Sequence, residues 1–447
     1  MFKAITNFFV HLVQRYLPDA FLFAVLLTLL VFVLGIVFTP STPIDMVAYW
    51  GEGFWELLTF AMQMTLIVVT GYILANTPPV KALLSNIASL AKTPGHAIIL
   101  VTVVSAIACL INYGFGLVVG ALFATHLSRV VPTVDYRLLV ASAYSGYLIW
   151  HGGLSGSVPL TIATEGHFLE EKLGIIPITE TLFSSYNLFI VISLIITLPI
   201  LNRLLLNTID KPTPASVVLR EQAAALEPER AEDVTTAAHI STPAERIENS
   251  TLLSMLIGLL GIAFVIRHFV INGFDLNINI INFIFLFLGI LLHKTPRRFL
   301  NSVTEGVKNA GGIIIQFPFY AGIMGMMSSS GLSELLSVIF VNISTEFTFP
   351  LLTFISAGIV NMFVPSGGGQ WAVQGPIMID AAMALGVDTA KTAMAVAWGD
   401  AWTNMIQPFW TLPLLAIAGL KVRDILGFCV IVLLWGFVPI AIGLLFF

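Results

Sequence analysis

The stretch Asn361-Met-Phe-Val-Pro-Ser-Gly-Gly-Gly-Gln-Trp371 interrupts a region, residues 349–420, that is otherwise apolar. A proline followed by three glycines does not sustain a regular helix facing lipid. Inside a bilayer every backbone N–H and C=O must find a partner in the protein. Irregular backbone at membrane depth therefore survives only where protein encloses it or where it lines a cavity. The stretch predicts a membrane segment that is broken at a binding site.

The composition of the whole chain supports a membrane setting. Of 447 residues, 57% are hydrophobic and only 10% are charged, whereas a soluble protein carries roughly 25% charged residues. Most of the surface is therefore expected to face lipid. The net charge of −5 is mild and argues against nucleic-acid binding. Cys109 and Cys429 both fall inside apolar runs, so they are expected to be buried thiols rather than a disulfide.

The apolar runs define predicted spans, because crossing a bilayer takes about 20 residues. These spans lie at roughly 18–38, 54–75, 184–206, 250–268, 278–293, 306–327 and 424–446. Two further apolar regions, 96–165 and 349–420, are interrupted by Gly, Asn, Pro, Ser and His. Residues 207–249 instead hold 12 charged residues in 43 positions and four prolines. That composition predicts a solvated linker between two halves.

The distribution of Lys and Arg predicts how the broken regions cross, because basic residues gather on the cytoplasmic side. Each region is divided into a re-entrant hairpin, which returns to the side from which it enters, and an interrupted full span. The hairpins are 96–128 and 349–386, and the interrupted spans are 137–165 and 389–420. With a cytoplasmic N-terminus, only Lys172, Arg267 and Lys391 of the 20 basic residues then fall outside. If the first hairpin crossed instead, the basic linker would lie outside, so the hairpin arrangement is preferred.

The two halves also match each other in register, at an offset of 249 residues in the broken regions and 253 upstream. The matched pairs are Asn112 and Asn361, Ser155 and Asn404, Pro159 and Pro408, Gln63 and Gln316, and Glu52-Gly53 and Glu305-Gly306. The charge count makes the first repeat enter from the cytoplasm and the second from outside, so the repeat is predicted to be inverted. The predicted domains are a first repeat over 1–206, a cytoplasmic linker over 207–249, and a linking span plus second repeat over 250–447.

Each break frees backbone N–H groups at the start of a half-helix, where the positive end of the helix dipole can hold a carboxylate. No Lys or Arg lies in any break. Helix ends and neutral donors could hold a monocarboxylate, whereas a dicarboxylate would more usually want a second cation. The alternative for the glycines is close packing between helices. For Asn112 and Asn361, and for Gln63 and Gln316, the alternative is hydrogen bonding that braces the bundle.

Two ionisable residues align across the repeat, His151 in the first half and Asp400 in the second. An ionisable group at membrane depth is costly and therefore suggests a function. Both are candidates for coupling transport to a proton or a cation. The alternative for Asp400 is an internal pairing, or contact with water admitted by the broken helix.

An enzymatic interpretation also has a motif in its favour. Gly153-Leu154-Ser155-Gly156 fits the nucleophile pattern of rhomboid-type intramembrane serine proteases. That chemistry needs a histidine base on a later span, within hydrogen-bond reach, and the later histidines all fall in loops or at span ends. No Walker A sequence is present, so ATP-driven transport by this chain is not expected. A channel and a membrane scaffold remain as further alternatives.

Longer motifs resemble the short-chain fatty acid transporter family, whose bacterial members are associated with acetoacetate and butyrate uptake. They are L-P-D-A-F-L-F-A (17–24), I-N-Y-G-F-G (111–116), W-H-G-G-L-S-G-S (150–157), N-M-F-V-P-S-G-G-G-Q-W (361–371) and G-D-A-W-T-N-M-I-Q-P-F-W (399–410). The family is related to a superfamily of ion transporters that includes divalent-anion symporters. The resemblance implies an all-α polytopic membrane protein with inverted repeats, re-entrant hairpins, discontinuous helices, an elevator-type mechanism and a homodimer.

The resemblance also implies a substrate site. Its residues are Asn112, Gly114, Gly116, Ser155, Ser157, Asn361, Ser366, Gly367, Gly368, Gly369, Gln370 and Asn404. The divalent-anion relatives carry Ser-Asn-Thr at their hairpin tips, whereas this chain has Asn-Tyr-Gly and Asn-Met-Phe. No sodium or other metal site is therefore transferred, and the coupling ion is left as Na⁺ or H⁺.

The sequence as a whole predicts a secondary transporter, not an enzyme, in the bacterial inner membrane. Its expected substrate is a short-chain monocarboxylate, with a dicarboxylate as the alternative. The carboxylate is expected between the two hairpin tips. The apolar tail is expected to meet Phe115, Phe363, Trp371 or Trp402. The expected surroundings are the lipid bilayer and a second copy of the chain.

Overall fold

The computed structural model describes residues 20–209, 211–217, 242–308, 310–407 and 409–447, and every regular element in these ranges is helical. Residues 17–19 of the first motif and the centre of the predicted linker, 218–241, lie outside the described residues. Seven described helices are long and apolar enough to cross a membrane. The chain is therefore an all-helical, multi-pass membrane protein.

The first half begins with spanning and peripheral helices and continues into the first broken region. Its elements are α2 (Ala20–Phe38), α3 (Pro43–Gly53), α4 (Leu58–Ala75), α5 (Pro78–Ala88), α6 (Pro94–Ile111), α7 (Tyr113–Val130), α8 (Tyr136–Ser145), η1 (Gly146–Gly152), α9 (Ser157–Ile162), α10 (Glu170–Leu173), α11 (Ser185–Leu205) and η2 (Leu206–Thr208). The elements α6 and α7 form the first hairpin, and α8, η1 and α9 form the first broken helix.

The second half has the same order of elements after a linking helix. It contains α13 (Pro243–Glu248), α14 (Thr251–Asn272), α15 (Ile278–His293), α16 (Pro296–Lys308), α17 (Gly311–Ser330), α18 (Leu332–Ile343), α19 (Phe349–Asn361), α20 (Gly367–Leu385), α21 (Thr389–Thr403), α22 (Thr411–Ala418) and α23 (Val422–Phe446). The elements α19 and α20 form the second hairpin, and α21 and α22 form the second broken helix. All four predicted breaks fall where the sequence places them.

Two predicted features differ from the structure in detail. The span expected at 306–327 is two helices, since α16 ends at Lys308 and α17 begins at Gly311. The pair Gly311-Gly312 begins α17, and glycine is a poor helix former, which is consistent with a helix boundary here. The first hairpin arm, α6, is itself long and apolar enough to span. It nevertheless packs along α7, its partner in the hairpin.

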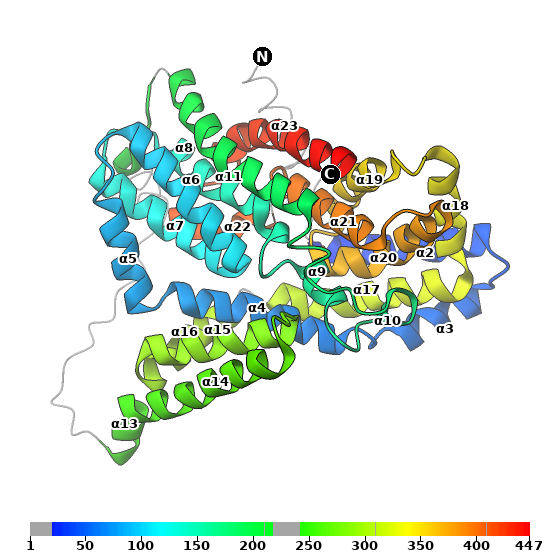
Figure 1. Ribbon diagram of the computed structural model, residues 1–447, viewed down its shortest axis with the longest axis horizontal. Coiled ribbons are helices and arrows are strands. Elements are labelled where there is room, and N and C mark those ends of the chain that lie inside the picture. The colour runs from blue at the N-terminus through cyan, green and yellow to red at the C-terminus, as the bar shows by residue number, and fades with distance from the viewer. Residues whose placement is uncertain (1–19, 210, 218–241, 309, 408) are drawn as a thin grey trace.

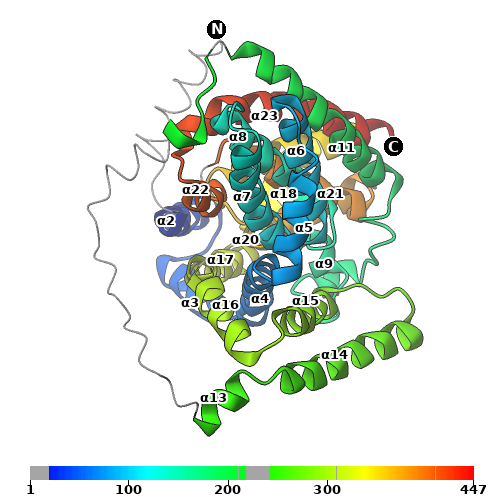
Figure 2. The ribbon, with the colours of Figure 1, turned by 90° about the vertical axis from the view of Figure 1, so that its left-hand side faces the viewer.

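The helices are arranged in two layers (Figures 1 and 2). One layer holds α3, α4, α17 and α14–α16, and α14 lies at its outer edge against α15. The other layer holds the hairpin helix α6 with α8, α11, α21 and α23. The second hairpin connects the layers, since α20 packs on both α17 and α21. The broken segments therefore meet in the interior of the molecule.

Reciprocal contacts join the two halves within the first layer. Helix α3 packs on α17, and α16 packs on α4. Both contacts depend on glycine: a Cβ on Gly53 would lie 3.0 Å from the Cα of Gly325, and one on Gly306 would lie 3.3 Å from the carbonyl oxygen of Val69. Gly53 and Gly306 are a matched pair of the sequence repeat. Small residues at such positions let helix backbones approach closely.

Candidate functional site

The first hairpin turns at a single residue, Asn112, whose extended backbone separates α6 from α7. Its side-chain oxygen accepts a hydrogen bond from the Phe115 N–H (2.8 Å), which caps α7. Its amide nitrogen donates to the carbonyl of Ile67 on α4 (3.2 Å). The next N–H, of Tyr113, donates to the hydroxyl of Ser155 (2.8 Å). The first hairpin tip is thus fixed to α4 and to the first broken helix.

The second hairpin turns over residues 362–366, and Ser366 caps α20 by accepting from the Gly369 N–H (3.3 Å). The three glycines that follow each face a different neighbour. A Cβ on Gly367 would lie 2.7 Å from the Ser157 hydroxyl, and one on Gly368 would lie 2.7 Å from the Phe60 ring. One on Gly369 would lie 2.6 Å from the Tyr320 ring. The glycine run is therefore required for close approach of this tip to both layers.

His151 and Asp400 are in contact at the centre, and both are fully buried. The Nδ1 atom of His151 lies 3.3 Å from the Asp400 carboxylate and 2.7 Å from the carbonyl oxygen of Ala397. A carbonyl only accepts hydrogen bonds, so Nδ1 carries a proton. The Nε2 atom lies 2.8 Å from the Ser157 hydroxyl. Ser157 donates to this nitrogen when the ring is neutral, and accepts from it when the ring is charged.

Two asparagines surround the backbone and carboxylate of Asp400. The Asn361 amide nitrogen donates to the Asp400 carbonyl (3.0 Å) and to the Thr403 hydroxyl (2.9 Å). The Asn404 amide nitrogen donates to the same carbonyl and to the Asp400 carboxylate (3.2 Å). Because these partners are acceptors, the orientation of both amides is fixed. Their oxygens must point elsewhere.

Several buried polar atoms in this region have no hydrogen-bond partner among the described residues, and they fall into two chemical sets. The acceptors are Asp400 Oδ1, Asn361 Oδ1, Asn404 Oδ1 and Gln370 Oε1. The donors are the indole N–H groups of Trp150 and Trp371 and the hydroxyl of Tyr147. Trp150 stacks on the His151 ring at 3.7 Å between centroids, and Tyr147 stacks on Trp150 at 5.6 Å. Unpaired buried polar groups are costly and often mark a functional site.

The structure brings six expected residues together. Two of them are the pair His151 and Asp400, and the other four contact that pair directly: Ser157, Gly367, Asn361 and Asn404. We call these six residues the central cluster. The other expected residues lie near it in supporting positions. Asn112 and Gly114 form the first tip, and Ser155 of the first broken helix accepts from the N–H of Tyr113 beside it. Gly116 packs on Cys109 between the hairpin arms, and Gln370 donates to Ala357 and Gln374 within the second hairpin.

The aromatic side chains expected to contact the apolar tail of the substrate lie in separate parts of the structure. Trp402 donates to the Leu433 carbonyl (2.7 Å) and packs on Phe354, on the side facing α23. Phe363 is 48% exposed and contacts Phe23. Trp371 is fully buried, and Phe115 is half-buried.

Other aromatic residues, which the sequence reasoning left out, lie closer to the centre. Tyr113, Tyr147 and Trp410 form an aromatic cluster with Trp150, in which the Tyr113 ring lies 4.7 Å from that of Trp150 and 5.6 Å from that of Trp410. The Trp410 indole donates to the Pro365 carbonyl in the second tip (3.0 Å). The signal available in the sequence was position, because Tyr113, Trp150 and Trp410 each lie in or next to a break.

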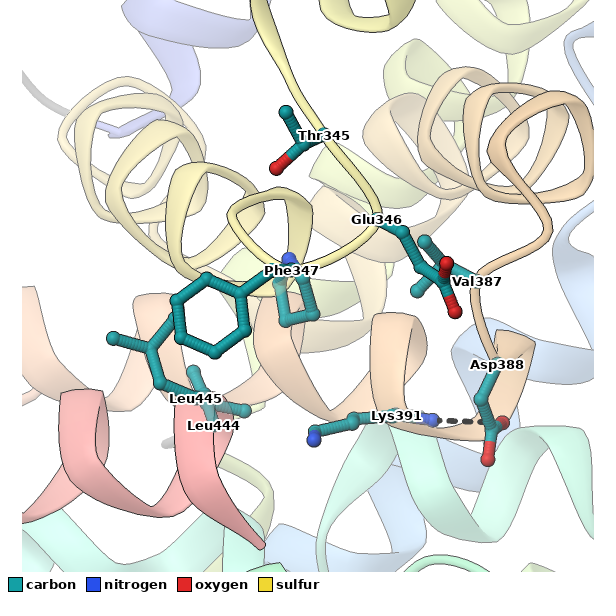
Figure 3. Close-up of a pocket in the computed structure, with 9 residues that line it drawn as sticks. Thr345, Glu346, Phe347, Val387, Asp388, Lys391, Leu444 and Leu445 are labelled. Carbon is teal, nitrogen blue, oxygen red and sulfur yellow. Dashed lines mark hydrogen bonds between the residues drawn. The ribbon is translucent and has the colours of Figure 1, made fainter.

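The larger cavities among the described residues lie away from the central cluster. Figure 3 shows one of about 520 Å³ near the rim, where Lys391 and Asp388 lie beside Phe347 and the end of α23. Asp388 caps α21 by accepting from the Lys391 N–H (3.3 Å). Another cavity, of about 390 Å³, is lined by Phe60, Gln63 and His167. Phe60 also covers Gly368, so this second cavity approaches the second hairpin tip.

Known proteins share both the sequence and the architecture. The pattern of the family described as short chain fatty acid transporter matches residues 1–447. A provisionally named short-chain fatty acid transporter of Escherichia coli (strain K12) is 48% identical over 447 residues, 100% of each chain. Its namesake from Haemophilus influenzae (strain ATCC 51907 / DSM 11121 / KW20 / Rd) is 45% identical over 453 residues, again 100% of each chain. The YdaH transporter of Alcanivorax borkumensis superposes with a TM-score of 0.59 at 16% identity, covering 96% of this chain and 97% of that one.

Paired hairpins and broken helices around buried ionisable residues are features of a multi-pass membrane transporter, and the likeness to YdaH shows this fold. The chain belongs to the short-chain fatty acid transporter family, and it is a transporter rather than an enzyme. The protease alternative also lacks its geometry, since Ser155 accepts from the Tyr113 N–H while His151 contacts Ser157 instead.

Proposed function

We propose that this transporter is a secondary active carrier of short-chain monocarboxylates such as butyrate or acetoacetate, driven by H⁺ or Na⁺. The observation that carries the proposal is the central cluster itself. The second hairpin and both broken helices meet there around a buried histidine–aspartate contact. The first hairpin tip comes close through the Tyr113 ring, 4.7 Å from that of Trp150. The protein is proposed to lie in the bilayer of the bacterial inner membrane as a homodimer. Its N-terminus and its linker are proposed to be cytoplasmic.

The unpaired donors support a carboxylate substrate. The indole N–H of Trp150 and the hydroxyl of Tyr147 have no hydrogen-bond partner in the described part of the chain. Trp150 stacks on His151, and Tyr147 stacks on Trp150. The Ser157 hydroxyl and the first turn of α20 add further donors at the second tip. No Lys or Arg belongs to the central cluster, so one carboxylate is easier to hold than two. A dicarboxylate remains the alternative substrate.

The unpaired acceptors support coupling to a cation. Asp400 is ionisable and fully buried, and its Oδ1 atom has no described partner. The unpaired oxygens of Asn361 and Asn404 belong to residues that contact the same aspartate. A proton on the His151–Asp400 pair, or a dehydrated Na⁺ among these oxygens, would satisfy atoms that are otherwise costly to bury. Uptake would then be linked to that ion, because the carboxylate binds beside it.

The movement that we propose is an elevator-like shift of the hairpins and broken helices against α15 and against α2, which packs on α17. Inverted repeats supply a fold with two equivalent faces. Two observations support the repeat. Gly53 of α3 packs against α17 as its matched residue Gly306 of α16 packs against α4, and the aligned residues His151 and Asp400 are in contact.

Uptake into proteoliposomes tests this proposal. Short acids cross lipid in their neutral form, so the assay is run at alkaline pH, where carboxylates are ionised. Labelled butyrate or acetoacetate is offered with a pH gradient or a Na⁺ gradient imposed separately, and protein-free vesicles are the control. We expect saturable uptake stimulated by one gradient. Absence of gradient-stimulated uptake for every C2–C6 monocarboxylate would overturn the substrate, and flux without saturation or coupling would identify a channel.

Two variants test the central cluster in the same assay. Asn361→Ala and Asn404→Ala each remove amides that fix the Asp400 backbone, and each is expected to reduce uptake by at least tenfold, on the order of 1.4 kcal/mol. Asn249→Ala is a matched control, because Asn249 is an exposed cap of α13 that is remote in sequence from every break. Unchanged transport in both cluster variants would remove these asparagines from the site.

A further inference from the structure

A small cavity of about 210 Å³ lies beside the first hairpin, between α4, α7, α16 and α22. Its walls are mostly apolar, with Leu117 and Val118 from α7 and Trp410 from the start of α22. Its lining also includes Gly114, in the first turn after the hairpin tip, and Lys308 and Glu305 of α16. The cavity therefore joins an apolar pocket to one cationic group.

A series of aromatic rings connects this cavity to the central cluster. Trp410 lines the cavity, and its ring is 5.6 Å from that of Tyr113. Tyr113 is 4.7 Å from Trp150, which stacks on His151. The same Trp410 donates to the Pro365 carbonyl of the second hairpin tip. The rings of Trp410 and Tyr113 thus separate the cavity from the cluster, and one of them is hydrogen-bonded to the second hairpin.

The cationic group in the cavity lining is the Lys308 ammonium, which pairs with Glu305. The Lys308 ammonium lies 2.7 Å from the Glu305 carboxylate, and both side chains are more than half exposed. Ion pairs that water reaches in this way are weak. The carboxylate of a small acid can therefore take the place of Glu305 on Lys308 while its alkyl chain enters the apolar part of the cavity.

The size of the cavity selects for small ligands. It is below the 300–1,000 Å³ range of drug-sized sites. Butyrate, with four carbons and two oxygens, fits within about 210 Å³.

We infer that this cavity is a second binding site for the transported acid, with the carboxylate on Lys308 and the alkyl chain between Leu117 and Trp410. The acid binds there before it enters the central cluster or after it leaves it. The Trp410–Tyr113 pair lies between the two sites. The inference rests on the proposed function, because it takes the short-chain acid as its ligand. It adds Lys308 as a binding residue and Leu117 as a determinant of chain length.

Thiol labelling tests occupancy of the cavity directly. Ala416 is exposed and lines the cavity, and both native cysteines are buried. Ala416→Cys in purified protein is labelled with a charged thiol reagent in the presence of butyrate or of an equal concentration of chloride. We expect butyrate to slow labelling at least threefold. In the Lys308→Gln background, about tenfold more butyrate should be needed for the same protection.

Charge and chain-length variants sharpen the test. Glu305→Gln removes the competing carboxylate and should lower the butyrate concentration needed, whereas Lys92→Gln removes an exposed charge that does not line the cavity and should change nothing. Leu117→Ala enlarges the pocket and should favour hexanoate over butyrate by several-fold relative to the parent protein.

The outcomes separate this inference from the proposed function. If the parent protein carries butyrate in vesicles but butyrate gives no protection of Ala416→Cys, the second site is wrong and the transport function stands. Protection that is unchanged in Lys308→Gln also overturns the inference. If no C2–C6 acid is carried at all, the proposed function itself fails.

Discussion

The two broken regions occupy matching positions in the sequence but differ in backbone and chemistry. The first hairpin turns at Asn112 alone, whereas the second uses residues 362–366. The first broken helix passes through His151 as a 3₁₀ helix over Gly146–Gly152, whereas the second remains α-helical through Asp400. A basic side chain in one half therefore meets an acidic one in the other. The comparison indicates that a repeated framework can place two different chemistries against each other.

The backbone difference has a direct effect on the position of His151. A 3₁₀ helix rises about 2.0 Å per residue and an α-helix about 1.5 Å. Seven residues of 3₁₀ helix therefore extend about 14 Å rather than about 10.5 Å. Glycines permit the stretch, since a Cβ on Gly146 would lie 2.6 Å from the Ala106 nitrogen and one on Gly153 would lie 2.6 Å from the Leu110 Cα. Packing against the first hairpin thus sets where the histidine lies.

The largest expected effect comes from removing one side of the central contact. His151→Ala leaves the buried Asp400 carboxylate without the histidine ring that faces it, and an uncompensated buried charge typically costs about 3–5 kcal/mol. Asp400→Asn keeps the shape, and His151 retains Ala397 and Ser157, so the loss should be nearer 1 kcal/mol. Both variants should lose gradient-driven uptake. Thermal unfolding in detergent and proteoliposome uptake measure the two properties.

A double-mutant cycle provides the control for this asymmetry. His151→Ala combined with Asp400→Asn removes the buried charge as well as its partner, so the double variant should be more stable than His151→Ala alone. Equal destabilisation by the two single changes, with no recovery in the pair, would show that the two side chains act independently. The contact between His151 of the first half and Asp400 of the second half would then contribute nothing to the free energy of unfolding.

The second largest effect concerns the hairpin tips. Gly367→Ala places a Cβ 2.7 Å from both the His151 Nε2 atom and the Ser157 hydroxyl, within the central cluster. Gly114→Ala places one 3.2 Å from the Val68 backbone, which is tight but allows small shifts. We expect Gly367→Ala to abolish uptake and Gly114→Ala to reduce it a few-fold, with similar expression of both. The reverse order would show that the first tip is the closer of the two to the transport path.

The sequence predicts the breaks well because their causes are local. The glycines at 152, 153 and 156 and the proline at 365 disfavour a continuous helix, and Asn112 and Ser366 are good N-caps. The glycines at 367–369 nevertheless form the first turn of α20. The alignment of His151 with Asp400 was also visible in the repeat. Their direct contact was not, because it depends on the 3₁₀ stretch that packing against α6 imposes.

Other features of the site depend on tertiary contacts and escaped prediction. The charge count places Lys308 on the cytoplasmic side, near the start of the predicted span 306–327. In the structure it lines a cavity, because α16 packs on α4. Trp402 was expected at the substrate, but its face of α21 is turned toward α23. A sequence pattern locates residues along a helix, whereas neighbouring helices decide which face is used.

A smaller effect is expected from the two N-caps. Asn112 accepts from the Phe115 N–H at 2.8 Å and also bonds to α4, whereas the Ser366 cap is longer, at 3.3 Å. Asn112→Ala should therefore cost about 1–2 kcal/mol and Ser366→Ala about 0.5 kcal/mol. Unfolding in detergent measures both. Asn112→Asp restores a capping oxygen and should recover part of the loss; failure to do so would assign the cost to the lost bond with Ile67.

The smallest expected effect distinguishes the loops that follow the two broken helices. After α9, burial lowers the pKa of His167 below its ordinary value of 6.5, and hydrogen bonding to Gly174 and the nearby Glu170 oppose this only in part. Its Nδ1 atom accepts from the Leu169 N–H (3.2 Å), and its Nε2 atom lies 3.0 Å from the Gly174 carbonyl. The folded loop therefore favours the neutral ring. As the pH falls through about 6.5, the opened loop binds a proton more readily than the folded one, and the folded loop loses stability.

Amide exchange at Leu169, corrected for its intrinsic pH dependence, should be several-fold faster at about pH 5.5 than at about pH 7.5. Exchange at Leu420, which follows α22, should not change. His167→Gln should remove the difference, and a rise that persists in this variant would assign it to another group.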